Sequence, residues 1–240
     1  MVYNADQKTR LFTGTADTIL KSADLPNNLK GLLIGNGWID PLNQYPAYLD
    51  FALEAGIVKK DSPIYGTIAH SVDSCNKTLT AKGVENIKVH NGGTCEAILS
   101  QITDSTIQNV NGQKMCVNNY DIRLTDKFPS CGAAWPPDLP DMYKFLNKPE
   151  VIKAFHATRK QEAWVECSGQ VGSQFWARKS APAVTLLPSL LEKVPILLFA
   201  GDQDLICCYK GIEALSNKLT WNGDTGFGVS CRLLSRGRSS

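Results

Sequence analysis

The sequence has little of what would mark a membrane or nucleic-acid-binding protein. It contains no run of about 18 consecutive apolar residues, so it predicts no membrane-spanning helix. Its 25 Lys and Arg against 23 Asp and Glu leave a net charge of +2, without the basic face that nucleic-acid binding needs. The first residues, MVYNADQKTRLFTG, lack the apolar region of a signal peptide. The 240 residues, 43% hydrophobic and 20% charged, are instead typical of a globular domain.

Histidine is also scarce, whereas cysteine is abundant. The three histidines (His70, His90, His156) do not stand at zinc-ligand spacing from the eight cysteines, and no C-x-x-C pair occurs. We therefore predict no metal site. Disulfides are the better interpretation for four cysteines in one turn-rich stretch: Cys75, Cys95, Cys116 and Cys131. Three pairings of these four are open.

One N-x-[ST] sequon follows the first of these cysteines, at Asn76. It predicts N-glycosylation, and its position agrees with a secreted, disulfide-bonded loop. Disulfides and glycosylation both imply an oxidising, secretory compartment. The chain shows no leader for that route, which suggests that its natural start is missing.

The apolar pattern predicts an α/β fold with a parallel sheet. Residues 29–34 and 196–200 are predicted as strands, apolar on both faces as in a sheet covered by helices. A further short strand is predicted near 120–124. Helical patterns occur at 44–58, 63–79, 94–101, 141–145, 149–156, 181–193 and 211–218.

Two stretches differ in texture from this pattern. Residues 59–134 are predicted as an inserted cap, because most of their length is polar, turn-rich and carries the four cysteines. Residues 228–240, GVSCRLLSRGRSS, are rich in Arg and Ser and are predicted to be disordered or foreign to the fold.

The segment PILLFAGDQDLICCYKG at 195–211 ends a buried strand in two aspartates. Functional groups gather at the carboxyl ends of strands in open α/β sheets. A carboxylate there, such as Asp204, can orient a histidine during acyl transfer. In the alternative interpretation, Asp202 or Asp204 caps the following helix or shapes the turn.

Four blocks carry a resemblance to a known family: NNLKGLLIGNGWIDPLNQY, CVNNYDIRLTDKFPSCGAAWPPDL, WVECSG and VPILLFAGDQDLIC. In this order they resemble the serine carboxypeptidases, and most nearly the fungal pheromone-processing, Kex-type branch, over about residues 20–227. The resemblance implies that residues 1–240 form an incomplete α/β-hydrolase fold with a disulfide-containing cap insertion. It also implies an enzyme of the secretory pathway that removes C-terminal residues, preferably Lys or Arg, from peptides and proteins. Such an enzyme uses a Ser-Asp-His triad and no metal or cofactor.

The resemblance also implies roles for individual residues. Asp204 matches the triad acid, and Asp202 would then be structural. Cys207 matches a normally unpaired cysteine of the substrate pocket, and Cys208 stands where the family usually has Asn. Cys167 matches one half of a disulfide to an upstream loop. The implied pairing in the cap is nested, Cys75 with Cys131 and Cys95 with Cys116.

The rest of the triad has no counterpart in this sequence. No G-x-S-x-G occurs, and all three histidines precede Asp204, whereas the family's histidine follows the acid. We therefore expect these 240 residues to lack peptidase activity, and a sheet without its first strands to expose apolar surface. The abrupt tail suggests a frame change or an unspliced intron.

Two other places are candidates for a role in the cleft. Trp38 and the pair Asp40-Pro41 follow the first strand and could face the cleft, but turn formation is the simpler interpretation. Glu166 could recognise a basic substrate side chain or be a solvated acid. Three hypotheses remain: a serine carboxypeptidase represented by an incomplete chain, an inactive truncated relative that binds peptides or nothing, and an unrelated hydrolase with a displaced nucleophile.

Overall fold

The computed structural model describes most of the chain. The described residues are 5–24, 28–83, 86–88, 93–160, 162–166, 168–170 and 180–226. The predicted tail at 228–240 lies outside them, as do His90, Cys167 and Cys231. No helix of the described part is long and apolar enough to cross a bilayer.

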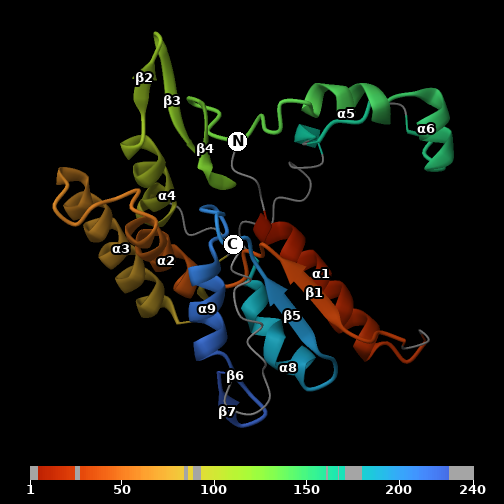
Figure 1. The fold of residues 1–240 in the computed structure, drawn as a ribbon. Helices are drawn as coiled ribbons and strands as arrows, with labels where there is room; N and C mark the ends of the chain where they lie inside the picture. Colours follow the sequence, from red (N-terminus) through yellow and green to blue (C-terminus); the bar gives the residue numbers. More distant parts are fainter. Residues whose placement is uncertain are drawn as a thin grey trace, which may run out of the picture.

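Two parallel strands lie at the centre of the fold (Figure 1). β1 (Leu32–Gly35) pairs with β5 (Ile196–Phe199), with Leu33 opposite Leu197 and Gly35 opposite Phe199. Both strands were predicted, β1 from a start a few residues too early. Because strands so far apart in sequence pair in parallel, the predicted α/β class is confirmed.

The two faces of this sheet differ. One face packs on η2 (Ala183–Leu186), α8 (Leu187–Leu191) and α9 (Tyr209–Lys218) around a buried cluster of Ile34, Ile39, Ala183, Leu187, Ile212 and Leu215. On the other face Leu33, Leu197 and Phe199 are 70%, 46% and 51% exposed. The expectation of exposed apolar sheet surface is therefore confirmed for the described residues.

Helices flank the sheet on its covered side. α1 (Ala5–Lys21), which was not predicted, lies along η2 and contacts β1. The predicted helix at 181–193 is only partly right, because it begins as the 3₁₀ turn η2 and is α-helical only in α8. Pro182 precedes this turn and Pro188 stands in the first turn of α8, and a proline fits only the start of a helix.

A second core joins α2 (Pro41–Glu54), α3 (Pro63–Lys82) and α4 (Gly93–Ser105) to the covered side. The Asp40 carboxylate caps α2 by accepting from the amide of Leu42 at 3.1 Å, and Pro41 takes the first helical position. The turn interpretation of Asp40-Pro41 therefore holds. Trp38 packs in the core against Tyr45 and Tyr48, with ring centroids 4.8 and 5.6 Å away.

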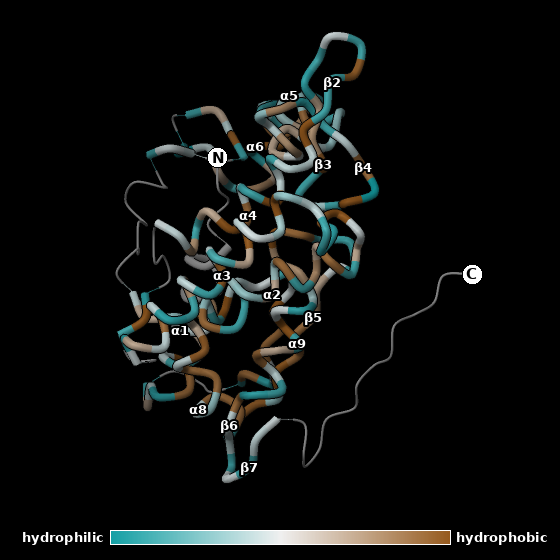
Figure 2. The backbone as a smooth tube through the Cα atoms, turned by 90° about the vertical axis from the view of Figure 1, so that its left-hand side faces the viewer, coloured by the Kyte–Doolittle hydropathy of each residue, from teal (hydrophilic) through white to brown (hydrophobic). Residues whose placement is uncertain are grey.

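An antiparallel sheet projects beyond α4. Its strands are β2 (Gln108–Val110), β3 (Gln113–Asn118) and β4 (Asp121–Lys127), of which β4 covers the predicted strand near 120–124. Asn111 and Gly112 form the β2–β3 turn with positive φ of 51° and 80°, the conformation that an Asn-Gly hairpin prefers. In the side view of Figure 2 this hairpin forms the upper end of the molecule.

The expected nested disulfide pairing is wrong. Cys75 on α3 is bonded to Cys95 on α4, and Cys116 on β3 is bonded to Cys131 after β4. α3 packs against α4, which brings the first pair to a Cα–Cα distance of 4.9 Å. The β3–β4 pairing brings the second pair to 5.5 Å. Each bond therefore closes locally, within the separation that a disulfide can span.

The remaining elements lie at the periphery. α5 (Leu139–Leu146) and α6 (Pro149–Ala154) confirm the two short predicted helices and form an arm away from the sheet (Figure 1). Phe145 and Phe155 are 54% and 70% exposed on this arm. The short strands β6 (Thr220–Trp221) and β7 (Asp224–Thr225) follow α9.

Candidate active site

The acid loop, defined here as residues 201–208, begins at the carboxyl end of β5. Its Asp204 is 6% exposed. One carboxylate oxygen of Asp204, Oδ1, accepts from the amide of Cys207 at 3.1 Å. The other, Oδ2, accepts from the side-chain amide of Asn36. Asp202, two residues earlier, is exposed. Of the two aspartates, the structure therefore buries the one that was predicted to be catalytic.

Asn36 reaches Asp204 because β1 and β5 are parallel neighbours. It directly follows β1, and its amide donates to the carbonyl of Phe199 at 2.8 Å. Its φ of 47° is in the left-handed region, which Asn tolerates better than most residues. The sequence analysis treated this residue only as part of a Gly-Asn-Gly turn. The signal that could have found it was a polar residue at the carboxyl end of the neighbouring strand.

Burial controls the electrostatics of this carboxyl group. Desolvation raises the pKa of Asp204, while the hydrogen bonds from Cys207 and Asn36 pull it down. The ionised form is thus held by directed donors in a poorly hydrated place. A carboxylate in this setting is suited to orient and stabilise a cationic imidazolium.

The two cysteines of the loop are buried. Cys207 and Cys208 are 4% and 2% exposed, and neither is in a disulfide. Burial raises the pKa of Cys208 to about 12. Cys208 is the N-cap residue of α9, and its side chain makes no capping hydrogen bond. Tyr48 lies beside this pair, and its hydroxyl donates to the carbonyl of Ile206 at 3.0 Å.

The side chain of Gln44 holds the turn that follows Asn36. The side chain of Gln44, 2% exposed, accepts from the amides of Ile39 at 2.6 Å and Asp40 at 2.8 Å. Its own amide donates to the carbonyl of Gly37 at 2.9 Å. The turn from Asn36 into α2 is therefore fixed by one buried side chain, a role that the sequence pattern did not indicate.

The two described histidines lie on other parts of the chain. His70 is exposed on α3 and His156 is exposed after α6. Neither is a hydrogen-bond partner of Asp204 within the described residues. Glu166 is half-buried beyond the arm, and Asn76 is exposed on α3. A cavity of about 230 Å³ lies on the arm beside Phe155 and Trp164 and does not include Cys207.

No cluster of three or more His, Cys, Asp or Glu side chains in the described ranges is arranged to hold a metal ion. The functional group that the described residues place at this strand end is the Asp204 carboxylate with its two amide donors.

Comparison with known proteins identifies the family. The family described as "Serine carboxypeptidase" matches residues 13–232, and the chain belongs to this family. Two similar relatives are pheromone-processing carboxypeptidases KEX1. The one from Puccinia graminis f. sp. tritici is 47% identical over 212 residues, and the one from Tuber melanosporum is 48% identical over 216. Each alignment covers 88% of this chain but only 32% and 34% of the relative.

A solved structure supports the fold. It is Kex1(delta)p, a prohormone-processing carboxypeptidase from Saccharomyces cerevisiae, 33% identical, with a TM-score of 0.81. The match covers 92% of this chain and 48% of that one. The chain therefore has the α/β-hydrolase fold that the resemblance implied, and it spans about a third of the length of the curated relatives.

Proposed function

We propose that this chain is part of a serine-type carboxypeptidase that releases C-terminal residues from peptides and proteins. The observation that carries the proposal is Asp204, a buried carboxylate with two amide donors at the carboxyl end of a central strand of the family fold. In this role Asp204 is the acid of a Ser-Asp-His triad and holds the imidazole in its working orientation. Cys207, buried three residues later, would line the pocket of the substrate residue.

The preferred substrates would carry Lys or Arg at the C-terminus. The similarity to pheromone-processing and prohormone-processing enzymes supports this preference. We also place the protein in the secretory pathway. Two disulfides and an exposed sequon at Asn76 support this location.

The test uses the protein as its source organism makes it, purified from the cell, with peptides that differ only in the last residue. We expect release of C-terminal Lys and Arg to exceed release of Leu. Asp204→Ala should lower kcat by about 10⁴-fold. Asp202→Ala, which changes an exposed aspartate two residues away, is the matched control and should retain activity. Equal activity in the two variants would remove Asp204 from the mechanism.

The second candidate is an inactive relative that binds peptides or has lost its role. The absence of G-x-S-x-G from these 240 residues, and of a histidine after Asp204, favours it. Both candidates predict that the purified 240-residue chain alone releases no C-terminal Lys or Arg, and the second predicts none from the protein purified from its source either. Measurable release that Asp204→Ala abolishes would overturn this expectation.

Glycosylation is tested separately from catalysis. The protein from its native host should lose apparent mass on treatment with an N-glycosidase, and Asn76→Gln should reduce that shift by the mass of one glycan. An unchanged mass in the unsubstituted protein would contradict both the modification and the support that it lends to a secretory location.

A further inference from the structure

The acid loop is held from one side by the turn between β3 and β4. The amides of Leu205 and Ile206 both donate to the carbonyl oxygen of Asn119, at 3.0 and 3.1 Å. The amide of Ile122 donates to the carbonyl of Gln203 at 3.0 Å. These three backbone hydrogen bonds fall on the residues that bracket Asp204. The hairpin therefore restrains the loop where the carboxylate is displayed.

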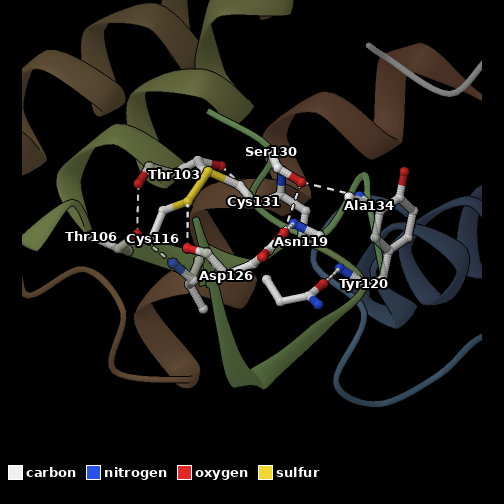
Figure 3. Close-up of a disulfide and its surroundings, with 12 residues drawn as sticks. Thr103, Thr106, Cys116, Asn119, Tyr120, Asp126, Ser130, Cys131 and Ala134 are labelled. Carbon is white, nitrogen blue, oxygen red and sulfur yellow. Dashed lines mark hydrogen bonds between the residues drawn. A yellow bond between two sulfur atoms is a disulfide. The ribbon is translucent and has the colours of Figure 1, made fainter. Parts of the chain in front are cut away.

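Asn119 is itself fixed by two neighbours. Its amide donates to the carbonyl of Cys131 at 3.0 Å, and its side-chain oxygen accepts from the Thr103 hydroxyl of α4 at 2.9 Å. Figure 3 shows Asn119, Thr103 and the Cys116–Cys131 bond in one cluster. The position of the Asn119 carbonyl thus depends on where Cys131 is held.

Several contacts hold the Cys131 turn in place. Cys131 has a φ of 45°, unfavourable for a residue with a side chain. The Asp126 carboxylate braces the turn by accepting from the Ser130 hydroxyl at 2.8 Å and the Gly132 amide at 2.9 Å. The disulfide ties the same turn to Cys116 on β3. The disulfide and the hydrogen bonds of Asp126 therefore together fix the turn on which the position of the Asn119 carbonyl depends.

We propose that Asn119 is a positioning residue for the triad acid, and that the Cys116–Cys131 disulfide is the clamp that keeps it in place. The predicted cap, through this hairpin, then sets the orientation of Asp204. The catalytic meaning rests on the proposed function, but the clamp itself is a property of these contacts. The other disulfide, Cys75–Cys95, joins α3 to α4 and does not hold the hairpin turn.

The loop carries its own reporters of opening. Cys207 and Cys208 follow Ile206 directly, are buried, and are not in a disulfide. A thiol-alkylating reagent reaches them only when the loop opens, so its rate of reaction measures the opening equilibrium. Trypsin releases residues 194–210 as one peptide, in which these are the only cysteines. Mass spectrometry of this peptide therefore follows the loop alone.

The two disulfides provide a matched comparison. The clamp variant is Cys116→Ala/Cys131→Ala, and the control is Cys75→Ala/Cys95→Ala. The closed loops span 15 and 20 residues, so the loss of chain constraint differs by a factor of only about 1.5 in the unfolding equilibrium. All four cysteines are buried. A difference between the variants therefore reports location rather than generic destabilisation.

We expect alkylation in the intact 240-residue chain to be about tenfold faster in the clamp variant than in the control, the effect of weakening two backbone hydrogen bonds. A carbon-13 titration of the Asp204 carboxyl should show its pKa move down toward the ordinary value in the clamp variant only, since opening rehydrates the group. Equal alkylation rates and equal pKa values would overturn the clamp.

A second pair of variants keeps the test decisive if either disulfide variant fails to fold. Thr103→Val removes the hydroxyl that donates to the Asn119 side chain. Thr106→Val is its control, because the Thr106 hydroxyl accepts from the Val117 amide of the same hairpin at 3.0 Å. We expect about threefold faster alkylation in the first variant than in the second. Equal rates would remove Asn119 from the role. None of these readouts requires peptidase activity, so a failure of the clamp and a failure of the proposed function are distinguishable.

Discussion

Two regions of the β1–β5 sheet differ in how well other residues hold or cover them. At the carboxyl ends of β1 and β5, the acid loop is held by Asn36, by Tyr48 and by the β3–β4 turn. On the open face of the sheet, Leu33 is 70% exposed. Phe199 lies over Gly35, where a Cβ would come within 2.5 Å of its ring.

The difference shows which parts of the architecture are complete within the described residues. Asp204 is buried and hydrogen-bonded by described residues of this chain, whereas other elements cover only one face of the β1–β5 sheet. Residues that position the acid should therefore behave as in an intact protein. Residues on the open face should behave as surface residues.

The largest expected effect compares neighbours on β1 that point to opposite faces. Ile34 is 7% exposed on the covered face, and Ile34→Ala should lower the free energy of unfolding by about 2–4 kcal/mol. Leu33→Ala on the open face should cost less than about 1 kcal/mol. Urea unfolding of both variants measures the two values. Similar losses would mean that something covers the open face in solution.

A smaller effect is expected where β1 meets the acid loop. Asn36→Gly keeps the positive φ but removes the donor to Asp204, and it should cost about 1–3 kcal/mol because a buried carboxylate loses its partner. The control is Asn111→Gly, another positive-φ asparagine, exposed in the β2–β3 turn. Its unfolding free energy should change by less than about 0.5 kcal/mol. Equal changes would show that the Asn36 side chain contributes nothing.

Asp204 itself should lower stability when it is ionised. Because burial raises its pKa, the native state binds the proton more tightly than the unfolded state does. Stability therefore falls as pH rises from the ordinary carboxyl value of about 3.9 through the raised native value. Asp204→Asn should then raise the unfolding free energy at pH 7 by about 1 kcal/mol, the usual size for a stabilising substitution.

This gain should shrink when the pH falls below the ordinary carboxyl value, where Asp204 is protonated in both states. Thermal unfolding across pH measures it. Asp202→Asn should change the free energy by less than about 0.5 kcal/mol at any pH. Some pH dependence should persist in Asp204→Asn, because burial also raises the pKa of Asp40. A stability loss in Asp204→Asn at pH 7 would contradict the assignment of desolvation as the larger influence.

The smallest effect on stability is expected on the open face. The triple variant Leu33→Thr/Leu197→Thr/Phe199→Thr keeps side chains suited to a strand and removes the exposed apolar surface. We expect less self-association by analytical ultracentrifugation, with little change in unfolding free energy. Phe145→Gln/Phe155→Gln on the α5–α6 arm is the matched control. If the arm variant alone reduces association, the open sheet face is not the adhesive surface.

The sequence allowed much of this fold to be predicted because its helices and strands follow local patterns. The strand at 196–199 is an apolar run, and α9 has a regular amphipathic face. α1 was missed because its sequence starts in polar residues with no apolar run to mark it. The disulfide pairing was wrong because it depends on which elements pack together, α3 on α4 and β3 on β4, and local sequence does not record that packing.

The candidate site divides in the same way. Asp204 was predictable because a carboxylate after a buried strand stands out in a linear sequence. Asn36, Gln44 and Asn119 were not, since each acts on residues that only the fold brings near, and Asn119 acts through its backbone carbonyl. Every residue type has a backbone carbonyl, so no sequence motif could have predicted this role.

The carbonyl of Asn119 has a consequence for how such enzymes can be shortened or recombined. The hairpin that provides it belongs to the stretch at 59–134 that was predicted as an insertion. A minimal hydrolase core made by excising that stretch would leave the amides of Leu205 and Ile206 without their acceptor. A chimera between family members would likewise need its β3–β4 turn and its acid loop from the same parent. The stretch at 59–134 is therefore not an interchangeable module. In a chimera, the β3–β4 turn has to be exchanged together with the acid loop that it holds.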